Sequence, residues 1–156
     1  MAELSHLDDE GNVHMVDVGD KPVTRRSATA RCVVLMDDAT AGAVVEGTTP
    51  KGDVLATVRL AAIQAVKRTP DLIPLCHPLP VDAVSVAIDR TAGGFEIRVT
   101  VTVEARTGVE MEAMTGASIG GLAMYDMVKG IDRGASLGTV ELLAKSGGRS
   151  GEWVRG

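Results

Sequence analysis

Asp126 and Lys129, in the stretch YDMVKG, have the residue types and the spacing of an acid–base couple. Residues three positions apart lie on the same face of a helix, so these two side chains would be in contact there. One interpretation is a plain surface ion pair, which is the commoner arrangement. The other is a catalytic pair, because a lysine beside a carboxylate can hold or pass a proton during a reaction. The residues alone leave both interpretations open.

Lys51 and Lys145 each stand where a phosphate group could bind. Lys51, in TPKGD, precedes a predicted helix, and the free N–H groups and positive dipole of a helix N-terminus attract anions. Lys145, in AKSGGRSG, ends a predicted strand and enters a glycine-rich loop that also carries Arg149. Glycine N–H groups in such a loop can form an anion-binding nest. A solvated lysine and a flexible tail are the plain alternatives, and the loop is not a Walker sequence.

The segment TPDLIPLCHPLPVD (69–82) holds four of the six prolines and encloses Cys76 and His77. Proline fixes its own φ and biases the preceding residue toward extended conformations, which predicts neither helix nor central strand here. Adjacent Cys and His are poor partners for one tetrahedral metal ion, so no metal is predicted. No base is apparent for a thiol nucleophile. The stiff segment instead indicates that His77 is a pre-positioned hydrogen-bonding group for a ligand.

Glu110 and Glu112, in GVEMEAM, stand near the start of a helix predicted over 107–134. Thr107 and Glu110 match a capping box, which explains Glu110. Glu112 has no such explanation, although the helix dipole favours carboxylates in a first turn. On one continuous helix, Glu112 and Asp126 would stand about 21 Å apart, at 1.5 Å per residue. One compact site could include both only with a second subunit or a long ligand.

The hydrophobic pattern predicts the elements that must position these residues. Strict alternation in FEIRVTVTVE predicts a strand, VDAVSVAIDR with the TAGG turn predicts its hairpin partner, and apolar residues three and four apart predict helices. The predicted order is strand 29–36, helix 37–47, helix 51–70, strands 81–90 and 95–104, helix 107–134 and strand 137–147. This order predicts an α+β, ferredoxin-like sandwich in which helices cover one face of an antiparallel four-stranded sheet.

Residues 1–28 have no clear periodicity and are interpreted as an N-terminal arm, and residues 29–156 as a single ferredoxin-like catalytic domain. The predicted helix over 107–134 also carries a run of small residues. A helical glycine costs about 1 kcal/mol relative to alanine, so this run predicts close contact with the sheet or with another helix. Its members are Ala113, Gly116, Ala117, Gly120 and Gly121.

The composition limits the classes of function. Apolar residues make up 45% of the 156 residues and aromatic residues only 2%, so we expect a core of small aliphatic side chains and apolar surface buried between subunits. The net charge of −5 argues against non-specific nucleic-acid binding. Apolar runs are too short for a membrane helix or a signal peptide, and two cysteines form no disulfide framework. A cytoplasmic protein without a membrane partner is therefore expected.

Taken together, five stretches resemble the family of cyclic pyranopterin monophosphate synthases, the C protein of the first stage of molybdenum-cofactor biosynthesis. The stretches are HMVDV, KGDVLATVRLAAIQAVKRTPDLIPLCHPL, TGVEMEAMTGAS, YDMVKGID and LLAKSGGRSG. The resemblance implies a phosphorus–oxygen lyase that converts 3′,8-cyclo-7,8-dihydro-GTP to cyclic pyranopterin monophosphate and releases pyrophosphate. It also implies a homohexamer, a trimer of dimers, with active sites at subunit interfaces.

The same resemblance implies roles for individual residues. Asp126 and Lys129 match the catalytic acid–base pair, and Lys51 and Lys145 match catalytic or phosphate-side lysines. The substrate-binding residues that it implies are Leu75, Cys76, His77, Met111 and Glu112. Residues in a further family motif have no role that the sequence assigns, and these are Asp17, Arg25 and Arg26.

The enzyme that the resemblance implies requires no cofactor. No acidic cluster demands Mg²⁺ with the triphosphate, and nothing in the sequence orders ring rearrangement and phosphate cyclisation. A regulatory module that binds a nucleotide without converting it is the competing interpretation, because ferredoxin-like domains also serve as small-molecule sensors and a fold does not settle a function. A third interpretation is a protein that serves only in assembly and neither binds nor converts a nucleotide.

Overall fold

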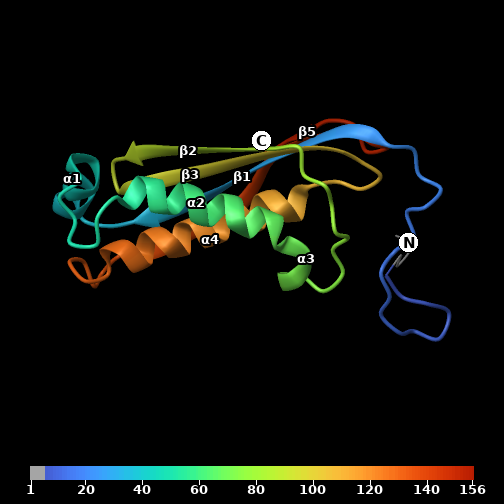
Figure 1. Cartoon of the computed structure of the whole chain (residues 1–156), viewed down its shortest axis with the longest axis horizontal. Coiled ribbons are helices and arrows are strands. Elements are labelled where there is room, and N and C mark those ends of the chain that lie inside the picture. The colour runs from blue at the N-terminus through green and yellow to red at the C-terminus, as the bar shows by residue number, and fades with distance from the viewer. Residues whose placement is uncertain (1–5) are drawn as a thin grey trace.

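The chain folds into an antiparallel sheet with its two long helices on one face, in the predicted order of elements with two additions (Figure 1). The computed structural model describes residues 6–156, so the first five residues of the predicted arm lie outside it. The elements are β1 Thr24–Leu35, α1 Asp38–Glu46, α2 Val54–Lys67, α3 Thr69–Leu72, β2 Ala83–Thr91, β3 Gly94–Ala105, α4 Glu110–Val128, β4 Ser136–Ser146 and β5 Trp153–Val154.

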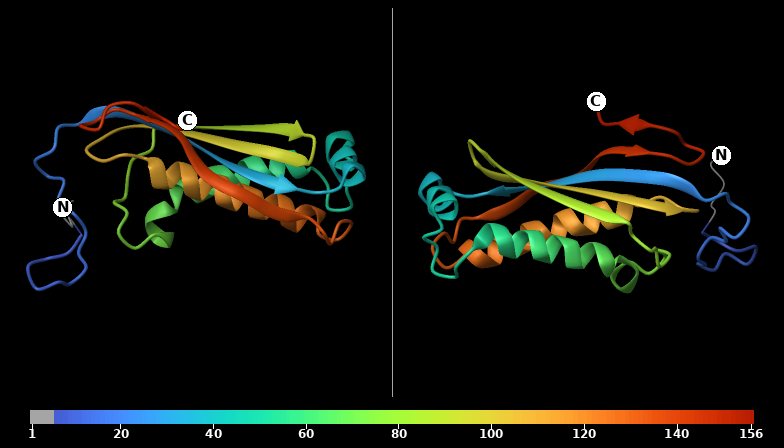
Figure 2. Two further views of the ribbon diagram at one scale, coloured as in Figure 1. Left: turned by 180° about the vertical axis from the view of Figure 1, so that it is seen from behind. Right: turned by 45° about the horizontal axis from the view of Figure 1, so that its top comes forward.

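The strands lie in the order β2-β3-β1-β4-β5, and every neighbouring pair is antiparallel. The predicted ferredoxin-like α+β sandwich is confirmed, with five strands in the described residues where four were predicted. The additional strand, β5, pairs Trp153 with Lys145 and Val154 with Ala144, and Figure 2 shows it folding back along β4. None of the helices in this part of the chain is both long and apolar enough to cross a bilayer.

Three local predictions are wrong, each for a physical reason. β1 begins at Thr24, inside the predicted arm, because Thr24 and the residues after it pair with the end of β3. The proline segment contains the short helix α3, with Pro70 in its first turn, where the missing N–H has no helical partner to lose. Thr107 does not cap α4, whose N-cap is Val109 without a side-chain hydrogen bond.

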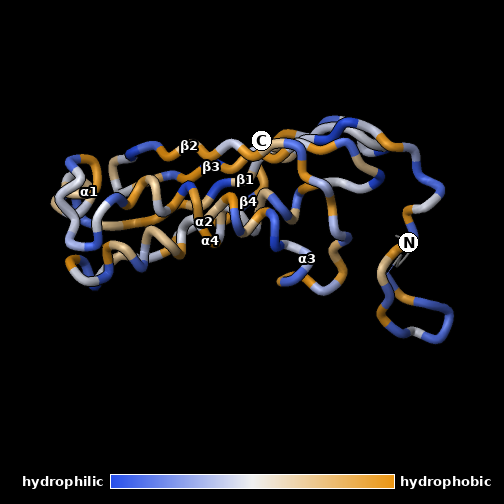
Figure 3. Tube along the Cα trace, viewed as in Figure 1, coloured by the Kyte–Doolittle hydropathy of each residue, from blue (hydrophilic) through white to orange (hydrophobic). Residues whose placement is uncertain are grey.

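Alternate residues of the central strands form the core. On β3 the buried hydrophobic positions are Phe95, Ile97, Val99, Val101, Val103 and Ala105, and on β1 they are Ala28, Ala30, Cys32 and Val34. Figure 3 shows hydrophobic and hydrophilic positions alternating along the strands. The intervening residues lie on the sheet face without the two long helices, where the Thr29 and Thr100 hydroxyls are hydrogen-bonded at 2.8 Å. The period-two pattern therefore decides which face packs against α2 and α4.

Glycines let α4 approach both α2 and the sheet, which confirms the predicted close contact. A Cβ atom on Gly116 would lie 2.7 Å from Val66 Cγ2 of α2 and 3.0 Å from Val99 Cγ1 of β3. A Cβ atom on Gly121 would overlap Sγ of Cys32 on β1. The helix can therefore lie this close to its neighbours only while these positions lack a side chain.

Gly121→Ala is expected to lower the free energy of unfolding by about 1–3 kcal/mol, because overpacking against Cys32 outweighs the gain in helix propensity. In a Cys32→Ala background the obstructing sulfur is gone, so the same change is expected to be neutral or stabilising. Urea denaturation of the four proteins measures both effects. Equal destabilisation in the two backgrounds would contradict the contact as the cause.

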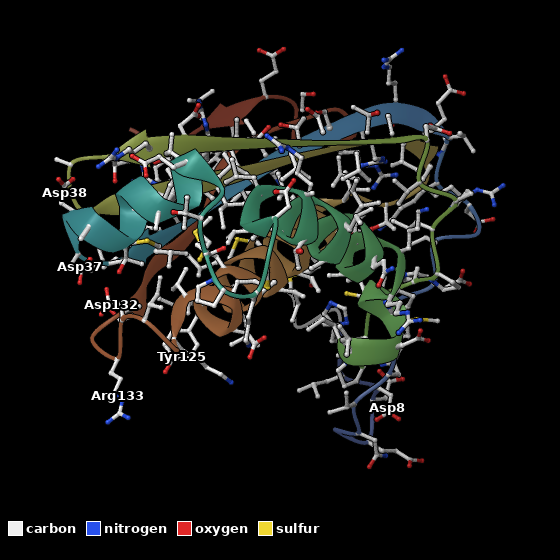
Figure 4. The ribbon with its side chains drawn as sticks, turned by 60° about the vertical axis from the view of Figure 1, so that its left-hand side comes forward. Asp8, Asp37, Asp38, Tyr125, Asp132 and Arg133 are labelled. Carbon is white, nitrogen blue, oxygen red and sulfur yellow. The ribbon has the colours of Figure 1, made fainter. Side chains whose placement is uncertain are left out.

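The helix α4 connects two ends of the molecule. Its first turn lies at the end that carries α3 and the N-terminal arm, and its last turn lies at the end that carries α1 (Figure 1). The buried Asp132 carboxylate accepts hydrogen bonds from the N–H of Asp37 at 2.9 Å and of Gly134 at 2.8 Å. Figure 4 shows Asp37 and Asp132 at the same end as Tyr125 of α4. These bonds fix the loop that follows α4, where Lys129 lies.

Candidate functional site

A cluster of three charged side chains lies at the C-terminal end of α4. Asp126 is in the last turn, and Lys129 is the residue directly after the helix. Lys129 Nζ lies 2.7 Å from Asp126 Oδ1, and Lys51 Nζ lies 2.9 Å from Asp126 Oδ2. Lys51 also donates to the Asp126 carbonyl oxygen at 2.6 Å. The predicted contact between Asp126 and Lys129 is present, and the loop before α2 adds Lys51 to it.

Two ammonium groups on one carboxylate set the protonation states of this cluster. The hydrogen bond from Lys129, and then the one from Lys51, lower the pKa of Asp126 to about 2. The same pairing raises the pKa of Lys129. At neutral pH Asp126 is therefore ionised and Lys129 protonated, and two cations face one anion. The side chains are about half exposed, so a phosphate from solution can reach the excess positive charge.

A cavity of about 450 Å³ lies at the other end of α4. The N-terminal arm, the proline segment and the residues from Thr107 to Glu112 line it. All five residues predicted to bind substrate are among its lining residues: Leu75, Cys76, His77, Met111 and Glu112. The structure thus brings together two segments that are far apart in the sequence, and their substrate-binding role stays a prediction.

The arm fixes His77 in this cavity. Nε2 of His77 donates a hydrogen bond to the Val16 carbonyl oxygen at 2.8 Å. The N–H of Cys76 is bonded to the Ile73 carbonyl oxygen at 3.1 Å, so the backbone before the histidine forms a tight turn. The Nε2 bond orients the ring and the turn positions its backbone, so Nδ1 is the ring nitrogen that can accept a hydrogen bond from a ligand.

Glu112 is the buried charged group of the cavity, with 3% of its surface exposed. Burial raises the pKa of its carboxyl group. Burial and, after it, the charge of Glu112 raise the pKa of the Cys76 thiol, so this thiol stays protonated at neutral pH and is a poor nucleophile. Within residues 6–156, no three side chains of His, Cys, Asp or Glu are grouped as metal ligands would be.

Glu110 belongs to the site, whereas the sequence pattern assigned it to a helix cap. Because α4 begins at Glu110 instead of Thr107, the carboxylate is free to contact β4. Its Oε1 accepts a hydrogen bond from Lys145 Nζ at 2.9 Å, and both side chains are about a third exposed. Only the pairing of β4 with β1 brings Lys145 to this end of α4, and no local sequence pattern shows that pairing.

The predicted site residues therefore form two separate groups in one chain. One group contains Lys51, Asp126 and Lys129, and the other contains Leu75, Cys76, His77, Met111, Glu112 and Lys145. Since α4 runs unbroken from Glu110 to Val128, Glu112 and Asp126 are about 21 Å apart along its axis. A single protomer does not assemble both groups into one compact site.

The motif residues without a predicted role make local contacts. Arg26 donates to the carbonyl oxygens of Ala105 and Arg106, both at 3.0 Å, and so stabilises the end of β3 beside β1. Asp17 Oδ1 accepts a hydrogen bond from the Gly19 N–H at 2.7 Å, which closes a turn in the arm. Asp17 therefore shapes the arm locally, and Arg26 ties β1 to the end of β3.

Comparison with known proteins gives concordant matches. The model of the MoaC family matches residues 15–148. A relative from Nostoc sp. is 50% identical over 154 residues, covering 97% of this chain and 92% of its own. A relative from Herpetosiphon aurantiacus is 51% identical over 152 residues, covering 96% of this chain and 93% of its own. A relative from Brucella ovis is 48% identical over 154 residues, covering 97% of this chain and 93% of its own. All three are named cyclic pyranopterin monophosphate synthase.

Proposed function

The chain belongs to the MoaC family, and on that premise we propose that it catalyses the last step to cyclic pyranopterin monophosphate in molybdenum-cofactor biosynthesis. It acts as a phosphorus–oxygen lyase: 3′,8-cyclo-7,8-dihydro-GTP is converted to cyclic pyranopterin monophosphate, and pyrophosphate is released. The observation that supports the proposal is the contact of Asp126 with Lys129 and Lys51, because a carboxylate–ammonium pair can transfer protons and a second ammonium group beside it can bind a phosphate.

The chemistry needs proton transfers and charge stabilisation. Rebuilding the imidazole ring as a pterin moves several protons, and we assign this shuttle to Asp126 and Lys129. In the cyclisation, a ribose-derived hydroxyl gives up its proton and attacks the α-phosphorus, while the bond from that phosphorus to the oxygen of pyrophosphate breaks. Cations stabilise the negative charge that develops on the phosphates. Lys51 and Lys145 supply the positive charge, and Arg149 in the glycine-rich loop is a further cation.

The protonation states of the cluster indicate how substrate activates it. A carboxylate with a pKa of about 2 is a weak base while both lysines are bonded to it. Substrate phosphates compete for the same ammonium groups. When a phosphate draws Lys51 away, one cause of the low pKa of Asp126 is removed, and the carboxylate becomes a better proton acceptor. The base is therefore strengthened when the substrate arrives.

The cavity-lining residues of the second group, which do not include Lys145, recognise the other end of the substrate. His77 and Glu112 grip the guanine-derived ring system, and Leu75, Cys76 and Met111 complete the surface around it. Because the two groups are about 21 Å apart on α4, the complete site needs the charged cluster of one protomer and the cavity of another. We propose a homohexamer built as a trimer of dimers, in which subunit interfaces bring them together. No resident cofactor is needed in this scheme, and Mg²⁺ bound to the triphosphate is compatible with it.

Turnover of the cyclised nucleotide tests the function directly. The purified protein is incubated with 3′,8-cyclo-7,8-dihydro-GTP and, separately, with GTP, and pyrophosphate and the pterin product are measured. We expect both products from the cyclised nucleotide and neither from GTP. Binding of both nucleotides without pyrophosphate release would instead support the regulatory module, and neither binding nor release would support an assembly protein.

A further inference from the structure

The C-terminal strand β5 is held by specific contacts instead of by burial. It consists of Trp153 and Val154, whose exposed fractions are 39% and 72%, so it adds little to the hydrophobic core. The two residues pair with Lys145 and Ala144 at the end of β4, where β5 folds back along the edge of the sheet (Figure 2). The position of β5 beside Lys145 therefore needs an explanation other than the stability of the core.

Arg155, the residue after β5, makes a set of contacts that hold this strand on β4. Its N–H donates to the Leu143 carbonyl oxygen at 2.8 Å, and its Nε donates to the Leu142 carbonyl oxygen at 2.7 Å. Nε also lies 3.3 Å from Glu141 Oε2, and the guanidinium carbon lies 5.5 Å from the centre of the Trp153 ring. An arginine at that distance from an aromatic face is attracted to it. One residue therefore joins β5 to three consecutive residues of β4.

These contacts lie at an irregular point in the pairing of β4 with β1. Leu143 is the extra residue of a β-bulge, because the pairing with β1 passes from Ala144 directly to Leu142. A bulge interrupts the ladder of hydrogen bonds and bends its strand. The last residues of β4, which include Lys145, therefore pair with β1 only along the short stretch beyond the bulge, and Arg155 contacts β4 at the bulge itself.

Arg155 is attached to the rigid part of the sheet. Its partner Glu141 also accepts hydrogen bonds from Arg31 of β1 at 2.5 and 2.8 Å, and Arg31 donates to Glu96 of β3 at 2.8 Å. The strand β5 in turn fixes the far end of the loop 147–152, which starts directly after β4. A loop with both ends fixed has fewer conformations than a tail with one end fixed.

We propose that Arg155 is a positioning residue for the reaction: it holds β5 against β4 and so fixes Lys145 and the loop 147–152 beside the leaving pyrophosphate. This inference rests on the proposed function for the role of Lys145. Opposite residues of an antiparallel pair project from the same face of the sheet, so Trp153 lies on the face where Lys145 contacts Glu110. Trp153 is also the only tryptophan of the chain, so its fluorescence reports whether β5 is in place.

The first measurement is acrylamide quenching of Trp153 fluorescence in the full-length protein and in Arg155→Ala, Arg155→Lys and Arg90→Ala. Arg90 is the matched control, because it is an arginine of similar exposure in an ion pair with Asp38, on β2 at the opposite edge of the sheet. We expect Arg155→Ala to raise the quenching rate constant about twofold, as the residue goes from 39% exposed toward full exposure. Arg155→Lys gives a smaller rise, because lysine keeps the charge without the planar stacking group, and Arg90→Ala gives none.

The second measurement is release of pyrophosphate from 3′,8-cyclo-7,8-dihydro-GTP by the same four proteins. For Arg155→Ala we expect kcat to fall about tenfold, because small misplacements of a catalytic group are costly. KM changes little, since Lys145 stabilises charge that develops only as the bond to pyrophosphate breaks. The urea midpoint stays at the wild-type value, because an exposed ion pair adds little stability. Arg155→Lys recovers part of the lost rate, and Arg90→Ala keeps the wild-type rate.

The outcomes separate this inference from the proposed function. Unchanged quenching in Arg155→Ala would show that Arg155 does not hold β5, and raised quenching with an unchanged kcat would show that β5 does not position the site. A fall in kcat that accompanies a lower urea midpoint would show a purely structural role. Each of these results overturns the inference and leaves the proposed function intact. Wild-type protein that releases no pyrophosphate would overturn the proposed function itself, before any variant is compared.

Discussion

Replacing Lys129 with alanine is expected to lower the rate constant for pyrophosphate release by roughly 10²–10⁴-fold, the range over which general acid–base groups contribute. Lys129 is the closer of the two cations to the Asp126 carboxylate, at 2.7 Å, and the first cause of the low pKa of that carboxyl group. Without it, the cluster loses both a proton donor and the group that orients the carboxylate. The rate constant and KM are measured separately with the cyclised nucleotide as substrate.

Two observations distinguish a catalytic loss from a folding loss. The ion pair is about half exposed, so its removal is expected to change the free energy of unfolding little. Arg59→Ala, the loss of an exposed cation far from Asp126 in sequence, is expected to keep the wild-type rate. A Lys129→Ala protein that is folded and releases pyrophosphate near the wild-type rate would remove Lys129 from the mechanism.

Replacing Glu112 with glutamine is expected to lower kcat/KM by about 10–100-fold, because a charged hydrogen-bonding group to the substrate becomes neutral. The same change is expected to stabilise the free protein at neutral pH. Burial raises the pKa of Glu112, so the folded state binds its proton more tightly than the unfolded state does. The resulting stability is fully present below the unfolded pKa, near 4.5, and is lost as the pH rises through the folded pKa.

Urea denaturation at pH 4 and pH 7 checks the stability part of this prediction. The variant should be more stable than the wild type at pH 7, and the difference should shrink at pH 4, where the wild-type carboxyl group is largely protonated. Glu46→Gln, at an exposed position in α1, is the matched control and should show no such pH dependence. A Glu112→Gln protein that is less stable at pH 7 would show that the carboxylate has a partner in the folded state.

The parts of the fold that follow a periodic pattern could be predicted from the sequence. β3 alternates without interruption from Phe95 to Val103, and the glycines of α4 had to lie against a neighbouring element. The spacing of Asp126 and Lys129 likewise predicted their contact, because it depends only on the helix between them. In each case the physical cause lies within a few residues of the feature.

Features that depend on distant parts of the chain could not be predicted. The start of β1 at Thr24 depends on pairing with β3, and polar side chains at that end hide the strand. Glu110 looked like a capping residue until the helix start and the position of Lys145 were known. The contact of Lys51 with Asp126 joins the loop before α2 to the last turn of α4, 75 positions apart in sequence. Local patterns contain no information about any of these.

Co-assembly of two inactive variants tests the central claim, that one active site combines the charged cluster of one protomer with the cavity of another. Lys129→Ala and His77→Ala proteins, each inactive alone, are unfolded together, refolded as mixed oligomers and assayed for pyrophosphate release. If the site is shared between protomers, random mixing leaves about a quarter of the sites with both groups intact, so about a quarter of the wild-type rate is expected. Mixed oligomers that remain as inactive as the parent variants would contradict the claim, because every site would then take both groups from one chain.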